Sequence, residues 1–392
     1  MDRSPGSQSA LRRANSALVL RALTEEGPLS HAELARHTGL SRASVTNIVR
    51  DLEASEEVRT FEEVRSGRRA RIAERLAPSG LVAAVNVGRN HLRVSISDLG
   101  LNVLSESEVA VPEGHRPEST LDRAAAMLLA QLAAVDKSPA DLVGVVAGFP
   151  APLERDRRTI GTGALLRSWV GTDLQAELGR RVGVPVVAEN DANLGALGEY
   201  RCGGYGRDVE NLIYIRVTTG IGAGMVLGGR LHRGATGVAG EIGHIGVEAA
   251  GALCRCGNRG CLEQYAIGPE MPDLDRVNRA ELATIEDLVR LAAEGEVTCR
   301  RVIDDMARHL GSAVASLCTT LNPDVIAFAG PITAADRLLL DPIRQEVSRR
   351  AVPEASRAVQ LGLARLGHRS EVLGALSLGA DLFGAPLADD KG

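Results

Sequence analysis

Three cysteines and two glycines within eight residues restrict how this chain can fold more than any other feature. The segment reads Cys254-Arg255-Cys256-Gly257-Asn258-Arg259-Gly260-Cys261, and His244 precedes it by ten residues. Glycines let a backbone turn tightly, so the three thiols can meet at one point. Three thiolates and one imidazole form a closed ligand set for Zn²⁺, which is typical of structural sites. The alternative is a tight loop of reduced thiols, which gains no core. We expect structural Zn²⁺ at His244, Cys254, Cys256 and Cys261.

Length, charge and hydropathy indicate a cytoplasmic protein of more than one domain. A chain of 392 residues suggests two or three units. Its first residues are polar, and no apolar run approaches the roughly 18 to 20 residues of a membrane span. We therefore expect no membrane contact and reduced cysteines. The net charge is −5, but the first 80 residues carry about +2, which is the sign expected of a DNA-binding part on an acidic body.

Residues 1–76 have the pattern of a winged helix-turn-helix domain. Apolar spacing predicts a first helix over 9–26. Ser30, with a glutamate three residues later, is a capping-box pattern that begins a short second helix. Gly39 supplies a turn before a third helix over 42–54. Helix, glycine turn and helix predict that this last helix enters the major groove of DNA.

The expected recognition helix begins with small and polar side chains, and Arg and Asn suit the edges of guanine and adenine. Strands over 58–61 and 70–76 would follow it, with an Arg-rich tip over 65–71 suited to phosphate or minor-groove contact. A protein-binding module of the same shape is the alternative. We expect DNA contacts from Ser41, Arg42, Ala43, Ser44, Thr46, Asn47, Arg50, Arg65, Arg68, Arg69 and Arg71.

From residue 77 onward the pattern is α/β. Apolar runs at 81–88, 91–98 and 101–111 predict three successive strands, and strands alternate with helices after them. A strand over 211–217 precedes the run Thr218-Thr219-Gly220-Ile221-Gly222-Ala223-Gly224. Such a run can cradle a phosphate, although glycine-rich hairpin turns without that role are also common.

Three segments together resemble the ROK family of repressors and sugar kinases. They are Gly240-Glu241-Ile242-Gly243-His244, the cysteine segment with the Leu262-Glu263 that follows it, and Glu189-Asn190-Asp191-Ala192-Asn193. The N-terminal pattern matches the repressor branch, which is similar to the xylose and N-acetylglucosamine regulators. The resemblance implies an α/β fold in which the winged helix-turn-helix over 1–76 precedes a two-lobed, actin-like, sugar-kinase-like body over 77–392. Lobe one would span about 80–190 plus the C-terminal helix, and lobe two about 191–370.

The resemblance also implies zinc at the same four residues and a sugar pocket between the lobes. In kinase members the residue matching Asp191 is the base that deprotonates the attacked hydroxyl. Carboxylates and an amide are suited to a polyol, although Asn190 and Asp191 could instead cap the next helix, and the glutamates could be ion-paired. By motif position, the sugar contacts would be Asn190, Asp191, Glu241, His244 and Glu263.

The first loop departs from the kinase pattern. Kinase members usually carry Asp-X-Gly-Gly-Thr there, but this chain has Asn86-Val87-Gly88-Arg89-Asn90. An amide replaces the carboxylate that would help to hold the Mg²⁺-nucleotide, and phosphoryl transfer depends on that metal charge. We therefore expect no enzyme activity, with Asp191 a vestigial base.

The sequence thus predicts a DNA-binding regulator, most simply a repressor, of carbohydrate-related genes. A sugar or sugar-phosphate effector would close the lobes of a homodimer or homotetramer and change its hold on a double-stranded DNA operator at the nucleoid. The alternatives are an ATP-dependent sugar kinase with an N-terminal DNA-binding module, and a constitutive DNA-binding protein with a vestigial pocket.

Overall fold

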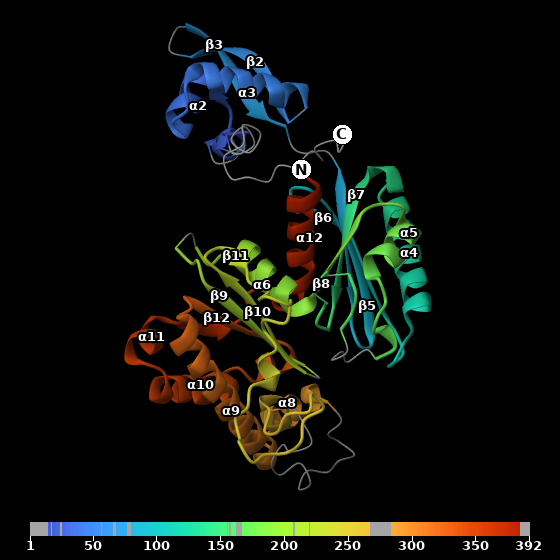
Figure 1. Cartoon of the computed structure of the whole chain (residues 1–392), viewed down its shortest axis with the longest axis vertical. Coiled ribbons are helices and arrows are strands. Elements are labelled where there is room, and N and C mark those ends of the chain that lie inside the picture. The colour runs from blue at the N-terminus through green and yellow to red at the C-terminus, as the bar shows by residue number, and fades with distance from the viewer. Residues whose placement is uncertain are drawn as a thin grey trace. The chain divides into compact units, whose positions relative to one another are not determined.

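The computed structural model divides the chain into two compact units, Met1–Ser79 with 384–392, and Gly80–Phe383 (Figure 1). Each unit is described by itself. Among the helices of the described residues, none is both long and apolar enough to cross a bilayer. The structure describes residues 15–16, 18–23, 26–55, 57–65, 68–76, 80–154, 156, 158–161, 167–206, 208–218, 220–266 and 284–384, without the side chains of residues 65 and 68.

The first unit is a helix-turn-helix followed by a long β-hairpin. Ser30 and Glu33 form the expected capping box, and Gly39 ends the second helix at a φ of 70°. The three-stranded sheet has the order β1-β3-β2. Strand pairing continues out to Arg65 opposite Arg68, so the predicted tip over 65–71 is too long. The elements are β1 (Leu29–Ser30), α2 (His31–Thr38), α3 (Arg42–Ala54), β2 (Val58–Arg65) and β3 (Arg68–Arg75).

Apolar spacing decides which face of α3 is exposed. Its side chains at Val45, Ile48, Val49 and Leu52 are buried in the core of this unit. Arg42, Asn47 and Arg50 therefore lie on the opposite, exposed face.

The second unit begins with a five-stranded sheet of order β6-β5-β4-β7-β8. The first three strands form the expected meander, and β4, β7 and β8 are parallel. Alternate residues of β4 face opposite sides, as strand geometry requires: Ala83 packs toward α4, and Ala84 toward the centre of the unit. The elements are β4 (Leu81–Val87), β5 (His91–Asp98), β6 (Val103–Ala110), α4 (Pro117–Ala134), η1 (Pro139–Asp141), β7 (Leu142–Phe149), η2 (Arg167–Trp169), α5 (Leu174–Val182) and β8 (Val186–Asn190).

A second five-stranded sheet has the order β11-β10-β9-β12-β13 and is covered on its outer face by helices (Figure 1). The phosphate-loop candidate over 218–224 is shorter than expected, because β10 already begins at Ile221. The elements are β9 (Leu212–Val217), β10 (Ile221–Leu227), β11 (Arg230–Leu231), η3 (Ile242–His244), α7 (Leu262–Ala266), α8 (Ile285–Glu294), α9 (Val297–Leu321), β12 (Val325–Ala329), η5 (Pro331–Ala335), α10 (Arg337–Arg350), α11 (Pro353–Ala358), β13 (Gln360–Leu363) and η6 (Gly367–Arg369).

Two helices, α6 (Asp191–Cys202) and α12 (Ser370–Phe383), lie between the two sheets (Figure 1). One apolar cluster joins both helices to β4 and β9. The helices touch through glycine: a Cβ on Gly198 would lie 1.9 Å from the Ser370 carbonyl oxygen, and one on Gly374 would lie 1.8 Å from that of Leu194. Small residues here let the two helix backbones meet directly.

Gly374→Ala should destabilise the second unit, because the new methyl group forces α6 and α12 apart. We expect a loss of about 1–3 kcal/mol, typical of overpacking, measured by denaturant unfolding. Gly362→Ala is the matched control, because a Cβ at that position meets no atom within 4 Å. Equal stability of the two variants would contradict a direct backbone contact between the helices.

Candidate functional site

The carboxyl end of β8 and the start of α6 place Asn190 and Asp191 together. Asn190 is the N-cap of α6: its Oδ1 accepts from the Asn193 amide at 3.1 Å, and its Nδ2 donates to the Ala151 carbonyl at 3.2 Å. The preceding Glu189 is 2% exposed and pairs with Arg233 at 2.6 Å. The helix-capping role considered for Asn190 is therefore present.

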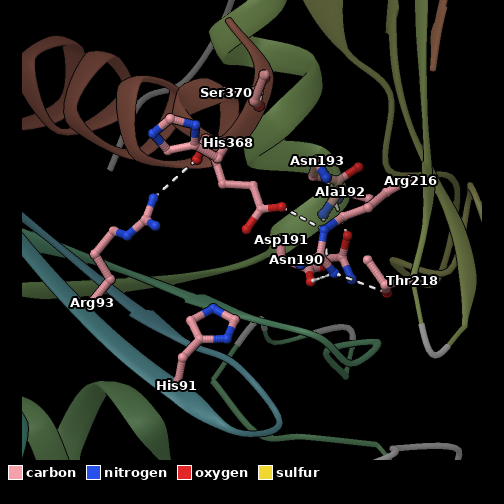
Figure 2. A network of polar contacts seen from close by, with 12 residues as sticks. His91, Arg93, Asn190, Asp191, Ala192, Asn193, Arg216, Thr218, His368 and Ser370 are labelled. Atoms are coloured by element: carbon pink, nitrogen blue, oxygen red, sulfur yellow. Dashed lines mark hydrogen bonds and ion pairs between the residues drawn. The ribbon is translucent and has the colours of Figure 1, made fainter. Parts of the chain in front are cut away.

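Asp191 is paired with an arginine that the sequence analysis did not single out. On β9, residues 212 and 214 face the central cluster, so Arg216 faces the same way by strand alternation. Its Nη1 donates to Asp191 Oδ2 at 2.9 Å, and its Nε lies 2.5 Å from Glu371 Oε1 on α12. Figure 2 shows Arg216 reaching toward Asp191 and Thr218. One guanidinium thus joins β9, α6 and α12.

Burial shifts the pKa of Asp191 within this group of charged side chains. Asp191 is 9% exposed, and loss of solvation raises its pKa to about 6, against the opposing pull of Arg216 and with the help of the Glu371 charge. A carboxyl group with that pKa changes charge near neutral pH.

A single cavity collects all five predicted sugar contacts: Asn190, Asp191, Glu241, His244 and Glu263 line it. Arg216, Thr218 and Gly220 line the same cavity, as do the Pro150-Ala151-Pro152 segment after β7 and Arg255. A polar hollow with converging carboxylates, an amide and backbone groups can bind a small polyol.

The two glutamates of the cavity differ in their surroundings. Glu263 is 7% exposed and pairs with Arg255, whose Nη2 lies 2.8 Å and 2.9 Å from its two carboxylate oxygens. The Glu241 carboxylate has no hydrogen-bond partner in the described part of the chain. Burial and the charges of Asp191 and Glu263 raise its pKa. Glu241 is thus the cavity carboxylate with the most unused hydrogen-bonding capacity.

Beside the cavity, His244, Cys254, Cys256 and Cys261 come together. One ligand atom from each lies within 4.8 Å of all the others. Cys254 Sγ is 3.6 Å from His244 Nδ1, Cys256 Sγ is 3.6 Å from Cys261 Sγ, and Gln264 donates to Cys254 Sγ. Gly260 allows this turn: a Cβ there would lie 1.6 Å from the Glu248 carbonyl oxygen. The cluster can hold a metal ion.

Known proteins match both parts of the chain. The ROK family profile matches residues 82–381, and the MarR family profile matches residues 12–70. The chain belongs to the ROK family. The xylose repressor of Bacillus subtilis strain 168 is 28% identical over 381 residues, which cover 96% of this chain and 97% of the repressor. The DNA-binding transcriptional dual regulator NagC of Escherichia coli strain K12 is 30% identical over 387 residues, which cover 95% and 94%.

Solved structures match in the same way. A ROK family transcriptional regulator, described as a homologue of the E. coli MLC protein, gives a TM-score of 0.80 at 24% identity over 95% of this chain and 97% of its own. A ROK family glucokinase from Streptomyces griseus, solved with glucose and AMPPNP, gives 0.62 at 30% identity over 76% and 99%. The predictions of a ROK transcriptional regulator, a helix-turn-helix and an actin-like, sugar-kinase-like α/β body are confirmed.

In this ROK chain, several predicted DNA-binding side chains have partners within the first unit. The Ser41 hydroxyl caps α3, and Ser44 contacts it at 2.9 Å. The Thr46 hydroxyl donates to the Arg42 carbonyl and lies 3.2 Å from His31 Nδ1. Arg42, Ala43, Asn47 and Arg50 remain exposed on one face.

The wing arginines also differ from one another. Arg71 is held by Glu53 at 3.0 Å and by the Thr60 hydroxyl at 2.7 Å, so it ties the wing to α3. Arg69 is exposed, 3.6 Å from Glu62. Arg65 and Arg68 belong to paired strands, but their side chains lie outside the described residues.

The first loop, over 86–90, carries two residues that the sequence analysis singled out. Asn86 is 5% exposed, and its side-chain amide has no partner among the described residues. Arg89 pairs with Glu113 rather than turning toward the cavity. Neither residue supplies an anionic ligand for a metal-bound nucleotide.

Sequence reasoning missed Arg216 and Arg255. The signal for Arg216 was its position two residues before Thr218, and for Arg255 its place between two cysteines. Arg216 pairs with carboxylates far along the chain, and the pairing of Arg255 with Glu263 depends on how the cysteine loop folds, so neither role can be read from local spacing.

Asp191→Asn tests the buried carboxyl group. The folded pKa of about 6 lies above the ordinary aspartate pKa of 3.8. The wild type therefore gains stability from Asp191 that is full below that ordinary pKa and is lost as pH rises through about 6. The melting temperature of the variant relative to the wild type should therefore rise between about pH 5 and about pH 7.5. Asp341→Asn, on the exposed side of α10, is the control. A difference that does not change with pH would contradict the assignment.

Proposed function

We propose that this chain is a DNA-binding repressor of carbohydrate-related genes, controlled by a sugar or sugar phosphate bound in the cavity of its kinase-like body. Residues 1–76 are its DNA-binding domain, and residues 77–392, in two lobes, are its effector domain. The observation that carries the proposal is the presence on one chain of an exposed recognition helix and a cavity lined by carboxylates. The names of the xylose repressor and of NagC support the same role. Such a protein acts in the cytoplasm, at the nucleoid.

The DNA interface is centred on α3. Arg42, Ala43, Asn47 and Arg50 on its exposed face contact base edges, and Arg69 with the side chains of Arg65 and Arg68 contacts the backbone. This surface is shaped by four further side chains through their contacts within the first unit: Ser41, Ser44, Thr46 and Arg71. Helix-turn-helix dimers read half-sites about 34 Å apart, so the active form is a homodimer or a homotetramer.

The metal is structural Zn²⁺, bound by His244, Cys254, Cys256 and Cys261. A tetrahedral Zn²⁺ with bonds of about 2.0–2.3 Å places neighbouring ligand atoms about 3.5–3.8 Å apart, and the two 3.6 Å separations fit that geometry. The ion would fix the loop that carries Arg255 and the helix that carries Glu263. His244 would then stand at both sites, since it also lines the cavity.

Phosphoryl transfer is not the function that these residues support. The kinase-like fold and the glucokinase similarity favour that alternative. Against it, Asn86 offers no charge for a metal ion, and phosphoryl transfer depends on that metal charge. The Asp191 oxygens already accept hydrogen bonds from the Ala192 amide and from Arg216, and each can accept a further one from a sugar hydroxyl.

Effector and operator are coupled in this proposal. Sugar in the cavity favours one arrangement of the two lobes, and that arrangement changes operator affinity. The coupling is reciprocal, so operator must change sugar affinity by the same factor. A protein that binds DNA regardless of every sugar would be a constitutive DNA-binding protein with a vestigial pocket.

Operator binding tests the function, with fluorescence anisotropy on DNA from upstream of the protein's own gene. Asn47→Ala should lose about 10- to 100-fold in affinity, as expected for one base contact of about 1–3 kcal/mol. Arg357→Ala, an exposed arginine of the body, should leave affinity unchanged. A panel of sugars and sugar phosphates should contain one compound that shifts wild-type affinity. Equal binding by both variants would refute the interface, and indifference to the whole panel would refute the effector.

Metal analysis tests the zinc site. Purified wild type should contain about one Zn²⁺ per chain and lose stability when a chelator removes it. Cys256→Ser should contain little zinc, while Cys202→Ser, outside the cluster, should match the wild type. Equal zinc content in the two variants would show that the four residues hold no ion.

A further inference from the structure

Arg255 extends into the cavity from the cysteine loop. The loop backbone is set by two hydrogen bonds, from the Cys254 amide to the Asn258 carbonyl at 2.7 Å and from the Gly257 amide to the Cys254 carbonyl at 3.0 Å. Because Arg255 stands between two cysteines of the metal cluster, its Cα is fixed relative to that cluster. Its side chain lines the cavity and reaches Glu263.

The guanidinium of Arg255 is only partly used. Both of its short contacts with Glu263 involve Nη2. Within the described part of the chain, Nε and Nη1 meet no acceptor, and the side chain is 37% exposed. The Arg255 guanidinium therefore has unused hydrogen-bond donors at the edge of the cavity, while its contact with Glu263 holds it in place.

The other cavity arginine does not offer the same capacity. Arg216 lies between Asp191 and Glu371, so its charge is already matched by two carboxylates. An additional anion near Arg216 would meet net negative charge. At the other end, Arg255 forms a hydrogen-bonded ion pair with Glu263 alone, although its charge also acts on the Glu241 carboxylate.

The chemistry of a guanidinium restricts what Arg255 can bind. It donates hydrogen bonds and accepts none, and its planar fork matches the paired oxygens of a carboxylate or phosphate. A neutral sugar binds through its hydroxyl groups, which can donate hydrogen bonds to the carboxylates of Asp191 and Glu241. Those carboxylates also repel anions, so an anionic sugar needs a cation with free donors in this cavity.

We infer that Arg255 determines effector specificity by binding an anionic oxygen group, a carboxylate or a phosphate, carried by the sugar. This inference rests on the proposed sugar-sensing function and narrows its effector to acidic sugars. The anion would bind at the solvent-facing edge of the Arg255 guanidinium, where Nε and Nη1 can donate to it. Nη2 would keep its contact with Glu263. The effector would then contact the metal loop directly.

A different role for Arg255 gives a different result. Three thiolates, one neutral imidazole and Zn²⁺ carry one net negative charge, which a nearby arginine could offset. In that case Arg255→Gln would lose zinc and stability without changing the preference among sugars. Metal content therefore separates the two roles.

The experiment measures binding to the full chain by calorimetry for matched pairs. These are glucose with glucuronate, gluconate and glucose 6-phosphate, xylose with xylonate, and N-acetylglucosamine with its 6-phosphate. In the wild type, one acidic compound should bind at least about tenfold more tightly than its neutral parent. Comparison of the carboxylates with the phosphates identifies the anionic group. Arg255→Gln should abolish that ratio while keeping zinc and neutral-sugar affinity.

Arg259→Gln is the matched control from the same loop, because Arg259 donates to the Gly251 carbonyl and does not line the cavity. It should keep the acidic preference. A neutral sugar bound as tightly as its acids, or an unchanged ratio in Arg255→Gln, would overturn the inference and leave the sugar-sensing function standing. Binding of no compound at all would overturn both.

Discussion

The direct contact between α6 and α12 is the constraint on which the cavity depends. Gly198 and Gly374 bring each helix against the backbone carbonyl groups of the other. That approach sets Asp191 at the start of α6 and Glu371 at the start of α12 within reach of one guanidinium from β9. A larger side chain at either glycine would separate the two carboxylates that Arg216 joins.

The same contact shapes the surroundings of Asp191 in this kinase-like fold. In this chain Asp191 is buried and paired with Arg216, and the first loop carries Asn86, a buried amide with no partner among the described residues. The cavity is lined by Asn190, Asp191, Glu241 and Glu263, whose oxygens can accept hydrogen bonds from hydroxyl groups. These groups support the proposed role as a sensor rather than as a kinase.

Two arginines line the cavity, and they differ in how far their hydrogen-bond donors are already used. Arg216 is fixed by two carboxylates and by strand geometry, and it stabilises the centre of the fold. Arg255 is held by the cysteine loop, and its Nε and Nη1 donors have no partner among the described residues. The cysteine cluster therefore does more than close a loop, because the residue between two of its cysteines lines the cavity.

The sequence by itself determined the family, the helix-turn-helix, the sheet strands and five of the residues around the cavity, because those depend on local spacing and on short motifs. Cap residues such as Ser30, the apolar runs from Leu81 onward and the cysteine spacing are all local properties. Only the tertiary structure decided that Arg216 joins Asp191 to Glu371, that Arg255 pairs with Glu263, and that Arg71 turns to Glu53 instead of standing free on the wing. Most of these pairs join charges far apart along the chain, and even Arg255 with Glu263 depends on how the cysteine loop folds. Their existence follows from packing that brings helices and strands together, which no local pattern encodes.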